Sequence, residues 1–472
     1  MKVLLINPPR ENEIIGNNPV IIEEERGHNP PLGLLSLAGY LEAHSDHRVE
    51  VIDSQVEELS YEALEERIRA AAPDAVGLTA MTMTLVDVLR TARLVKKARP
   101  GALVVLGGPH VHLFPEETIA FPEVDFLVRG EGEEAFPELL EYAGDKRRLR
   151  EVKGLVFKDG ERTVITDARP AIEDLDRLPF PARRLVPYQR YSSLLAKGDC
   201  VTTVFTSRGC PYRCAFCARP HLGKRFRARS PRNVVDELEE CKRMGIDEFL
   251  VYDDTFTVDR ERVIDICAEI VRRRLDIGFD IRARVDTISD AMLAALKRAG
   301  CRGIHYGVEA GTAKILQVLK KGITIEQAAE VFRLTKRRGI PVLAYFMIGN
   351  PTETREDIEE TFRVARRLAP DYVHMTILTP FPGTEIYARG LESGVLPSDV
   401  WRAFAKNPDA SFDPPHWGER FTRGELNELL VEGYRRFYLR PSYILRRLVR
   451  LRSFSEFKRK ARAGLKVLGM RA

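Results

Sequence analysis

Short apolar runs alternate with amphipathic stretches along the first 145 residues. The runs are rich in Val, Leu and Ile, and the stretches between them repeat apolar side chains at helical spacing. Strands that are apolar throughout, each followed by a helix, are typical of a parallel sheet covered on both faces. The pattern predicts an α/β fold that opens with a doubly wound, Rossmann-like domain. Its strands are expected at 2–7, 49–53, 75–80, 103–108 and 124–130, and its helices near 33–44, 60–72, 84–98 and 133–142.

The alternation is interrupted in the middle of the chain and then returns. Residues 146–200 are predicted to form a linker that contains a β-hairpin, with Asp159 and Gly160 at its turn. Residues 201–385 hold six more strand–helix units, which predict a partial (β/α)6 barrel of the TIM type. Residues 386–472 are expected to be a helical, basic C-terminal region. The six barrel strands are expected at 201–206, 248–254, 279–285, 303–310, 341–349 and 372–379.

Cysteine usage and the length of the apolar runs exclude several classes of protein. The chain of 472 residues has seven cysteines, an odd number that does not fit a secreted disulfide scaffold. Cys241, Cys267 and Cys301 lie in apolar-periodic segments and are expected to be core thiols. The first apolar run stops at Asn7, too early for a signal peptide, and no run approaches the length of a membrane span. These features predict a cytoplasmic protein.

The net charge of +5 is unevenly distributed. From Tyr434 to Ala472 there are thirteen Lys and Arg against one acidic residue, Glu456. One interpretation is a helix packed on the barrel with a solvated cationic face. Another is a helix at the inner surface of the membrane, which would make the protein peripheral to it. Nucleic-acid binding is not expected, because no recognised RNA-binding motif accompanies the charge.

Three cysteines lie within eight positions, directly after the first predicted barrel strand. Cys210, Cys214 and Cys217 have CxxxCxxC spacing, in a loop that also contains Gly, Pro and Arg. Three thiolates can hold three irons of a [4Fe–4S] cluster and leave the fourth iron open to a small molecule. The alternatives are unpaired core cysteines or a zinc knuckle. A structural zinc site needs four ligands, for which only His221 lies nearby.

With Phe216 before the last cysteine, this loop resembles that of the radical S-adenosylmethionine (SAM) superfamily, and the resemblance covers roughly residues 200–385. It implies that SAM chelates the open iron through its amino and carboxylate groups. Reductive cleavage would then give methionine and a 5′-deoxyadenosyl radical, which abstracts a substrate hydrogen. An electron donor such as flavodoxin or ferredoxin is implied as a partner.

The ends of the later barrel strands also resemble the SAM site of that family. The resemblance places near SAM Asp253 and Asp254 (amino group), Arg282 and Arg284 (carboxylate), Glu309 (ribose), and Gly349, Pro351 and Pro382 (adenine). We expect only one of the two arginines to face the barrel interior. Several of these residues have a structural alternative: Asp254 as a turn cap, Glu309 as a buried structural carboxylate, and Gly349 and Pro351 as turn formers.

The first domain resembles the cobalamin-binding domain that precedes the barrel in one large subfamily. Its marks are "NPP", "GGPHVH" and "VRGEGE", each at the end of a predicted strand. The Asp-x-His-x-x-Gly signature is absent, so neither His110 nor His112 is expected to ligate cobalt. A Rossmann-like nucleotide domain is disfavoured by the lack of GxGxxG, and a domain that has lost cobalamin is a second alternative. The residues placed near cobalamin are Pro8, Pro9, Thr82, Gly107, Gly108, His110, Gly130, Glu131 and Gly132.

The resemblance as a whole implies a cobalamin-dependent radical SAM methyltransferase that acts on an unactivated carbon. Methylcobalamin would deliver the methyl group, and a second SAM would restore it. Cyclisation, ring contraction or carbon–carbon coupling would share the same motifs. A non-enzymatic sensor that binds the cluster and cobalamin is the third hypothesis. The segment "FYLRPSYI" resembles the C-terminal region of bacteriochlorophyll cyclases and lipid-modifying members, which points to a hydrophobic small-molecule or lipid substrate.

Alanine in place of Cys210, Cys214 or Cys217 is expected to abolish reductive cleavage of SAM, because the cluster would lose a ligand. Production of 5′-deoxyadenosine by the reconstituted variants measures this. Cys241→Ala, which changes a predicted core thiol, is the matched control. A loop variant that retains full 5′-deoxyadenosine production would contradict the assignment.

Overall fold

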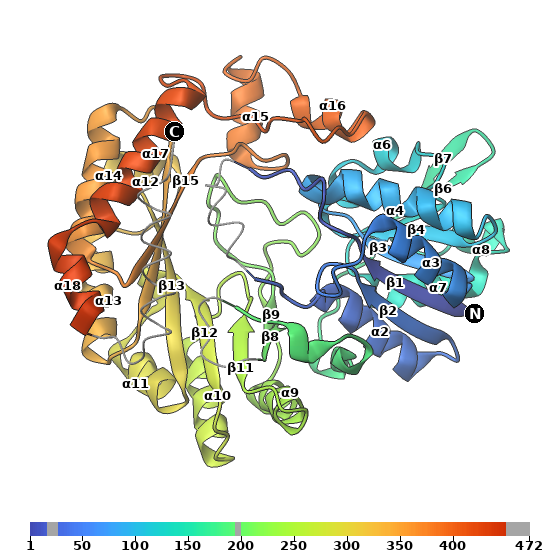
Figure 1. Cartoon of the computed structure of the whole chain (residues 1–472), viewed down its shortest axis with the longest axis horizontal. Coiled ribbons are helices and arrows are strands. Elements are labelled where there is room, and N and C mark those ends of the chain that lie inside the picture. The colour runs from blue at the N-terminus through green and yellow to red at the C-terminus, as the bar shows by residue number, and fades with distance from the viewer. Residues whose placement is uncertain (17–26, 194–199, 450–472) are drawn as a thin grey trace.

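The computed structural model describes residues 1–16, 27–193 and 200–449. Two sheets lie side by side, one in the N-terminal domain and one in a half-open barrel (Figure 1). The α/β class, the doubly wound first sheet and the partial barrel are confirmed. None of the described helices is long and apolar enough to cross a membrane.

The N-terminal sheet has the strand order β2-β1-β3-β4-β5-β6-β7. Its first five strands are parallel, and the order reverses at β1, so the carboxyl ends of β1 and β3 flank the switch point where such sheets bind ligands. The strands are β1 (Lys2–Asn7), β2 (Arg48–Asp53), β3 (Ala75–Thr79), β4 (Leu103–Gly107) and β5 (Phe126–Val128). The helices are α2 (Leu32–His44), α3 (Tyr61–Ala71), α4 (Leu85–Ala98), α5 (Pro109–Leu113), α6 (Pro115–Ile119), α7 (Gly132–Tyr142) and α8 (Lys146–Leu149).

The predicted hairpin is present, but it belongs to the first sheet. Strands β6 (Leu155–Asp159) and β7 (Arg162–Ile165) turn at Gly160, and β6 pairs antiparallel with β5. The linker expected over 146–200 therefore starts as part of the domain, because the apolar face of β6 is buried against it. In the described part of the segment that follows lie the short 3₁₀ turns η2 (Leu175–Arg177), η3 (Arg183–Leu185) and η4 (Tyr188–Arg190), and Ser192 forms an isolated β-bridge with His28.

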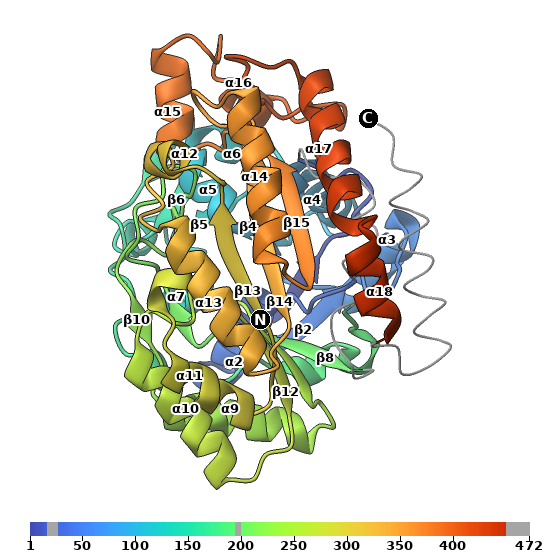
Figure 2. The same cartoon turned by 90° about the vertical axis from the view of Figure 1, so that its left-hand side faces the viewer.

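The second sheet is parallel, with the order β15-β14-β13-β12-β11-β8. Its end strands, β8 and β15, do not pair, so the barrel stays open on the side of the N-terminal domain, and its helices cover the outer face (Figure 2). The strands are β8 (Val201–Val204), β11 (Glu248–Val251), β12 (Gly278–Ala283), β13 (Cys301–Glu309), β14 (Val342–Ile348) and β15 (Tyr372–Ile377). The helices are α9 (Pro231–Arg243), α10 (Arg260–Arg272), α11 (Asp290–Arg298), α12 (Ala313–Val318), α13 (Ile325–Arg337) and α14 (Arg355–Leu368).

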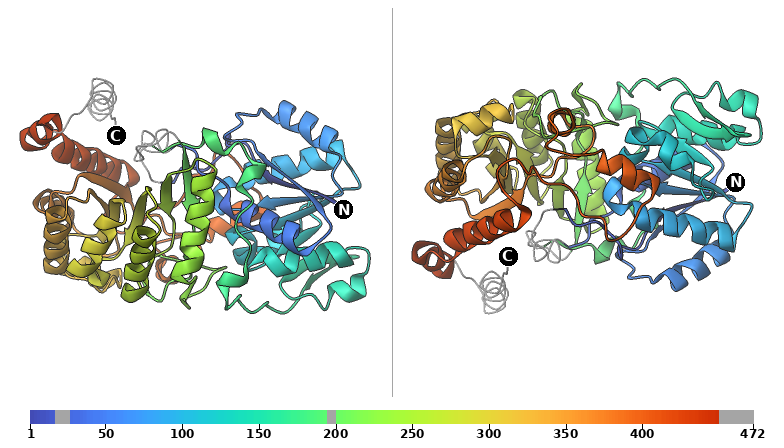
Figure 3. Two further views of the ribbon diagram at one scale, coloured as in Figure 1. Left: turned by 90° about the horizontal axis from the view of Figure 1, so that it is seen from below. Right: turned by 90° about the horizontal axis from the view of Figure 1, so that it is seen from above.

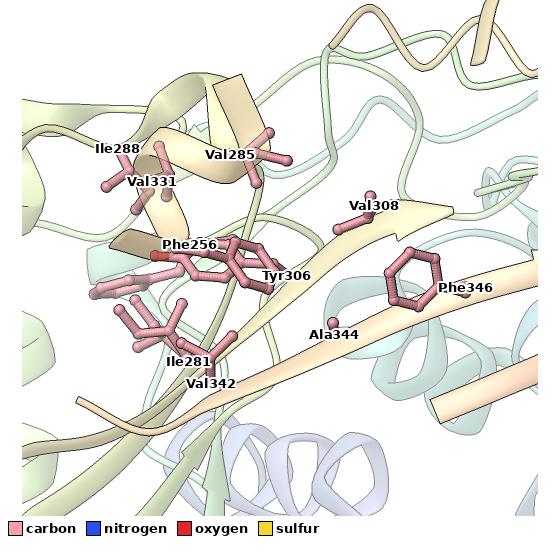
Figure 4. Close-up of a cluster of buried hydrophobic side chains, with 14 of the residues drawn as sticks. Phe256, Ile281, Val285, Ile288, Tyr306, Val308, Val331, Val342, Ala344 and Phe346 are labelled. Atoms are coloured by element: carbon pink, nitrogen blue, oxygen red, sulfur yellow. The ribbon is translucent and has the colours of Figure 1, made fainter. Parts of the chain in front are cut away.

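One apolar core holds the barrel sheet against its helices. Side chains such as Phe256, Tyr306 and Phe346 are at most 2% exposed and pack with aliphatic residues from neighbouring strands (Figure 4). Cys241, Cys267 and Cys301 belong to this core, as expected. Most of the barrel strands end earlier than the sequence predicts, because their last predicted residues, such as Asp253 and Arg284, leave the sheet and enter the loops.

The C-terminal helices connect the two domains. Helix α17 packs along β15, where the Tyr434 hydroxyl donates to the Met375 carbonyl oxygen. Helix α16 lies against α6 of the N-terminal domain, and Arg402 pairs with Glu117 across that contact (Figures 1 and 3). The helices are α15 (Glu385–Glu392), α16 (Val400–Lys406), α17 (Arg423–Tyr438) and α18 (Pro441–Val449). The part of the basic tail over residues 450–472 lies outside the described residues.

The segment after the hairpin is held closely against α2. A Cβ atom on Gly39 would lie 2.4 Å from the Phe180 carbonyl oxygen, whereas a Cβ on Gly33 of the same helix would meet nothing within 4 Å. Gly39→Ala is expected to destabilise the protein by about 1–3 kcal/mol through overpacking. Gly33→Ala is expected to stabilise it by up to about 1 kcal/mol through helix propensity. Thermal melting of both variants measures the difference, and equal melting temperatures would contradict the predicted contact.

Candidate functional site

The cysteine loop leaves the barrel through a two-residue strand and returns through another. Strand β9 (Ser207–Arg208) pairs antiparallel with β10 (Arg227–Ala228), which closes the base of the loop. Gly209 has φ 78°, and a Cβ there would lie 2.2 Å from the Arg225 carbonyl oxygen. Only glycine therefore fits at the point where the loop begins.

Each of the three thiols has a polar neighbour. Arg219 Nη1 donates to Cys217 Sγ at 2.8 Å, and Arg284 Nη1 lies 3.6 Å from Cys214 Sγ. The buried Cys210 Sγ lies 3.6 Å from the Thr255 hydroxyl. Donors directed at sulfur stabilise its anionic form, so the donor set fits an anionic iron–sulfur group.

The zinc alternative finds no support among the described residues. No three His, Cys, Asp or Glu side chains in that part of the chain converge closely enough to hold one metal ion. Burial lowers the pKa of His221, the candidate for a fourth ligand, to about 4, so this side chain is neutral at pH 7. Ligands of a cubane cluster bind separate irons and need not converge on a point, so the cluster assignment of the three cysteines stays a prediction.

The two aspartates after β11 have different environments. The Asp253 carboxylate is buried and accepts hydrogen bonds from Thr206 N (2.6 Å) and from the Thr206 and Ser207 hydroxyls (2.5 and 2.6 Å). Asp253 therefore orients the start of the cysteine loop, and its oxygens are already occupied. Asp254 is open to the site and lies 3.6 Å from Arg219 Nε, and burial raises the pKa of its carboxyl. The helix that follows, α10, is capped by Asp259, and the choice between a SAM contact and a turn cap for Asp254 stays open.

The two arginines stand two positions apart, Arg282 in β12 and Arg284 directly after it, and their environments differ. Positions two apart share one face of a strand, so strand alternation does not separate them, and the expectation that only one faces the barrel interior stays a prediction. Arg284 is fixed by the Asp286 carboxylate, by the Lys321 carbonyl oxygen (2.6 Å) and by the ring of Tyr212. Arg282 stacks 3.6 Å above Tyr252 and, among the described residues, has no carboxylate partner.

Glu309 ends β13 with φ 74°, a conformation that is strained for a residue other than glycine. Its carboxylate pairs with Lys321 Nζ at 2.7 Å, and both side chains are buried. A Cβ on Gly307 would lie 2.3 Å from Glu309 Oε1, so the glycine makes room for the pair. Lys321 was not predicted as a site residue. It stands between another lysine and a glycine, and this sequence context gives no sign that the side chain is buried.

The segment that follows β14, which the resemblance places beside adenine, is closely packed. On Gly349, a Cβ would lie 2.9 Å from Leu426 of α17, and φ is 75°, so this glycine shapes the turn. Pro351 and Pro382 are buried. The sequence analysis missed Glu353, which accepts a hydrogen bond from the Asn350 backbone N–H at 2.8 Å. Burial raises the pKa of Glu353 to about 7.

His110 lies at the carboxyl end of β4 and is fully buried. Its Nδ1 lies 3.1 Å from the Thr82 hydroxyl, and its Nε2 has no partner among the described residues. Burial lowers the pKa of His110 to about 3, so the ring is neutral. Nδ1 of His112 and Nε of Arg129 are also buried, and the described part of the chain gives neither atom a partner. Such atoms at the ends of β4 and β5 fit a polar group that enters from the strand ends, as cobalamin amides would.

The glycines expected near cobalamin divide into two kinds. On Gly108, with φ 98°, a Cβ would lie 2.9 Å from the Ala80 carbonyl oxygen, so this glycine is needed by the fold itself. A Cβ on Gly107 or Gly132 would make ordinary contacts, and one on Gly130 would meet nothing within 4 Å, which leaves open space at the end of β5. Pro8 and Pro9 are buried after β1.

Glu131 makes contacts that the sequence analysis did not foresee. Its carboxylate, expected near cobalamin, pairs with Arg208 Nη1 (2.6 Å) and Arg227 Nη1 (2.9 Å) of the barrel. Glu133 pairs with Arg208 Nη2 at 2.5 Å. The Glu131 carboxylate therefore holds the base of the cysteine loop, and a contact of this residue with cobalamin stays a prediction. No local sequence signal links the partners, because the acidic and the basic residue of each pair lie at least 75 positions apart.

Two family models match the chain in the order of its domains. The model described as B12 binding domain matches residues 19–140, and the model described as Radical SAM superfamily matches residues 204–365. The first match contains β2 to β5 of the N-terminal sheet, and the second contains the cysteine loop and β11 to β14 of the barrel.

Curated relatives match almost the whole chain. The uncharacterized methyltransferase PH0819 of Pyrococcus horikoshii is 35% identical, over 94% of this chain and 94% of the relative. The anaerobic magnesium-protoporphyrin IX monomethyl ester cyclase of Rubrivivax gelatinosus is 31% identical, over 94% of this chain and 78% of the relative. Among solved structures, the cobalamin-dependent SAM radical enzyme OxsB has the same fold, with a TM-score of 0.72, 19% identity and coverage of 97% of this chain and 70% of that one.

The raised pKa of Glu353 predicts a pH-dependent stability. The native state binds the proton more tightly than the unfolded state, in which the pKa is near 4.5. The stabilisation that the protonated Glu353 gives to the folded state is complete below pH 4.5. The free energy of unfolding falls by roughly 3 kcal/mol as the pH rises through about 7. Glu353→Gln is expected to be as stable as the wild type at pH 5 and more stable at pH 8.

Melting temperatures of the cluster-free proteins at several pH values test this expectation. Glu356→Gln, which changes an exposed carboxylate of the same segment, is the control and should follow the wild type above pH 5. A constant difference between Glu353→Gln and the wild type from pH 5 to pH 8 would contradict the assignment.

Proposed function

The chain belongs to the radical SAM superfamily, among the members that carry a B12 binding domain, and from this premise we propose that it methylates an unactivated carbon of a hydrophobic small molecule. It is a cobalamin-dependent radical SAM enzyme, and its cofactors are a [4Fe–4S] cluster, SAM and cobalamin. The methyl-transfer outcome and the substrate class are what we propose.

One contact carries the proposal. On Gly383, beyond β15, a Cβ would lie 2.8 Å from Leu113 Cδ2 and 3.7 Å from Ala218 Cβ. Leu113 follows β4 of the cobalamin-binding domain, and Ala218 follows the last cysteine of the loop. The strand ends of both domains therefore meet at one place, which a transfer between two cofactors requires.

The residues of the chain would divide the work. Cys210, Cys214 and Cys217 would hold the cluster, and Arg282, a cation without a carboxylate partner among the described residues, would hold the SAM carboxylate. The open carboxylate of Asp254 would accept a hydrogen bond from the SAM amino group. When bound, the cluster with SAM supplies a hydrogen-abstracting radical, and cobalamin supplies the methyl group. Helix α16 packs on α6, and this contact would shield one side of the space between the strand ends from water.

Exposed apolar side chains at the same edge support a hydrophobic substrate. Met81, just beyond β3, is 51% exposed, and Phe381, beyond β15, is 38% exposed. Ile15 is 44% exposed and follows Ile14, whose N–H donates to the Met83 carbonyl oxygen. Contiguous exposed apolar patches mark binding surfaces, and we propose that these side chains form one with the substrate.

A second outcome has a specific observation in its favour. One of the relatives that match 94% of this chain is named as a cyclase, and the other as a methyltransferase. Oxidative cyclisation would use the same cysteine loop and the same strand ends. It would differ in the products that SAM leaves, which makes the two outcomes separable by experiment.

We also propose a peripheral contact with the membrane through the C-terminal helix. On α18, Ile444 is 43% exposed and Leu445 is 65% exposed, next to Arg446 and Arg447 in the sequence. Tyr443 at the start of the helix packs instead on the barrel, since its hydroxyl donates to the Asp371 carbonyl oxygen. Exposed apolar side chains that are followed by arginines in the sequence suit an anionic lipid surface.

The products of SAM test the proposed reaction. The reconstituted protein, loaded with cobalamin, is incubated with a reductant, SAM and a lipid extract from its host. Methyl transfer predicts 5′-deoxyadenosine and S-adenosylhomocysteine in similar amounts, both dependent on the extract. The Cys214→Ala variant is the control and should yield no 5′-deoxyadenosine.

5′-Deoxyadenosine that depends on the extract, without S-adenosylhomocysteine, would contradict methyl transfer and favour the cyclisation alternative. Extracts separated into lipid and water-soluble fractions test the substrate class. A response confined to the water-soluble fraction would contradict a hydrophobic substrate.

A further inference from the structure

The base of the cysteine loop carries two arginines that lie opposite each other. Arg208 and Arg227 are a cross-strand pair in the β9–β10 ribbon, and Arg208 stands two positions before Cys210. Side chains of two like charges directly opposite each other destabilise a ribbon unless an anion lies between them. Glu131, from the loop after β5 of the cobalamin-binding domain, provides that anion.

The contacts of Glu131 join three separate segments. Arg208 Nη1 and Arg227 Nη1 both donate to it, and its Oε2 also accepts a hydrogen bond from the Ile172 backbone N–H at 2.7 Å. Arg227 Nη1 in turn donates to the Ile172 carbonyl oxygen. The cobalamin-side loop, the connecting segment and the base of the cysteine loop are thus fixed by one carboxylate.

Burial makes this junction energetically strong against loss of one partner. The Glu131 and Arg227 side chains are 5% and 2% exposed, and that of Arg208 is 19% exposed. Burial alone would raise the pKa of Glu131, but the charge of Arg208 and the hydrogen bonds of both arginines hold it below its usual range. Removing one partner leaves a buried charge uncompensated, which is far more costly than losing a surface pair.

We propose that Glu131, Arg208 and Arg227 are positioning residues that fix the separation between the cluster and cobalamin. The proposal rests on the proposed function, because it assumes that both cofactors are bound. Glu131 directly follows Gly130, beside which the described residues leave open space. A shift of the Glu131 carboxylate would therefore move the end of β5, which is expected to face cobalamin. The forked contact of Arg208 with Glu131 and Glu133 resists rotation as well as separation, since two parallel ion pairs define a direction.

Electron paramagnetic resonance of the protein with both cofactors measures this separation without a substrate. Cob(II)alamin and the reduced cluster are both paramagnetic, and their dipolar interaction falls with the cube of the distance. In the wild type we expect one narrow distribution of the coupling. Glu131→Gln removes the charge but keeps the shape of the side chain. It is expected to broaden the distribution of the dipolar coupling and to lower the mean coupling, while both cofactors remain bound.

Arg208→Met is the second variant, because it breaks the forked contact and leaves the Glu131–Arg227 pair in place. It decides the question if Glu131→Gln fails to fold. Glu173→Gln is the matched control: it breaks a pair with Arg225 on the same loop, but these side chains are 56% and 75% exposed. It should keep the coupling of the wild type.

Coupling as in the wild type, in a variant of Glu131 or Arg208 that holds both cofactors in full, would overturn the positioning role. A wild-type protein that binds no cobalamin would instead refute the proposed function, and this is measured before any variant is compared. The two failures are therefore distinct.

Discussion

Two parallel sheets can serve one reaction only if the carboxyl edges of their strands face each other. Ligands bind at these edges in open sheets and in barrels alike, so the orientation of the two domains decides whether two cofactors can meet. Here, the edges meet where Leu113 and Ala218 approach Gly383. The pairs of Glu131 with Arg208 and Arg227, and the contact of α16 with α6, hold the domains in that orientation.

The cysteine loop depends on charges that lie elsewhere in the chain. Residues 201–235 contain eight Lys and Arg and no Asp or Glu. Acidic groups of other elements neutralise part of this charge, as when Glu237 of α9 pairs with Arg229 and with Arg183. Arginines near the sulfurs remain available to an anionic cluster. A loop of this charge is consequently stable only when the rest of the molecule surrounds it.

Apolar periodicity was sufficient to predict the parallel strands of both sheets, because strands such as β1, β3, β4 and β11 are buried along nearly their whole length. It could not show that the hairpin at Gly160 extends the first sheet, since pairing between β5 and β6 leaves no local signal. The cysteine loop could be predicted from the sequence because its three thiols are close together along the chain. The same closeness would allow them to bind one cluster. Lys321 and Glu353 were missed because burial, which gives them their properties, is set by distant segments.

We infer that one chain holds a cluster and cobalamin in a shared space. Iron, sulfide and cobalamin content after anaerobic reconstitution tests it most directly, together with the cluster spectrum before and after SAM is added. We expect one [4Fe–4S] cluster and one cobalamin per chain, and a cluster signal that changes when SAM binds. A protein that takes up the cluster but no cobalamin, or a cluster signal that SAM leaves unchanged, would contradict it.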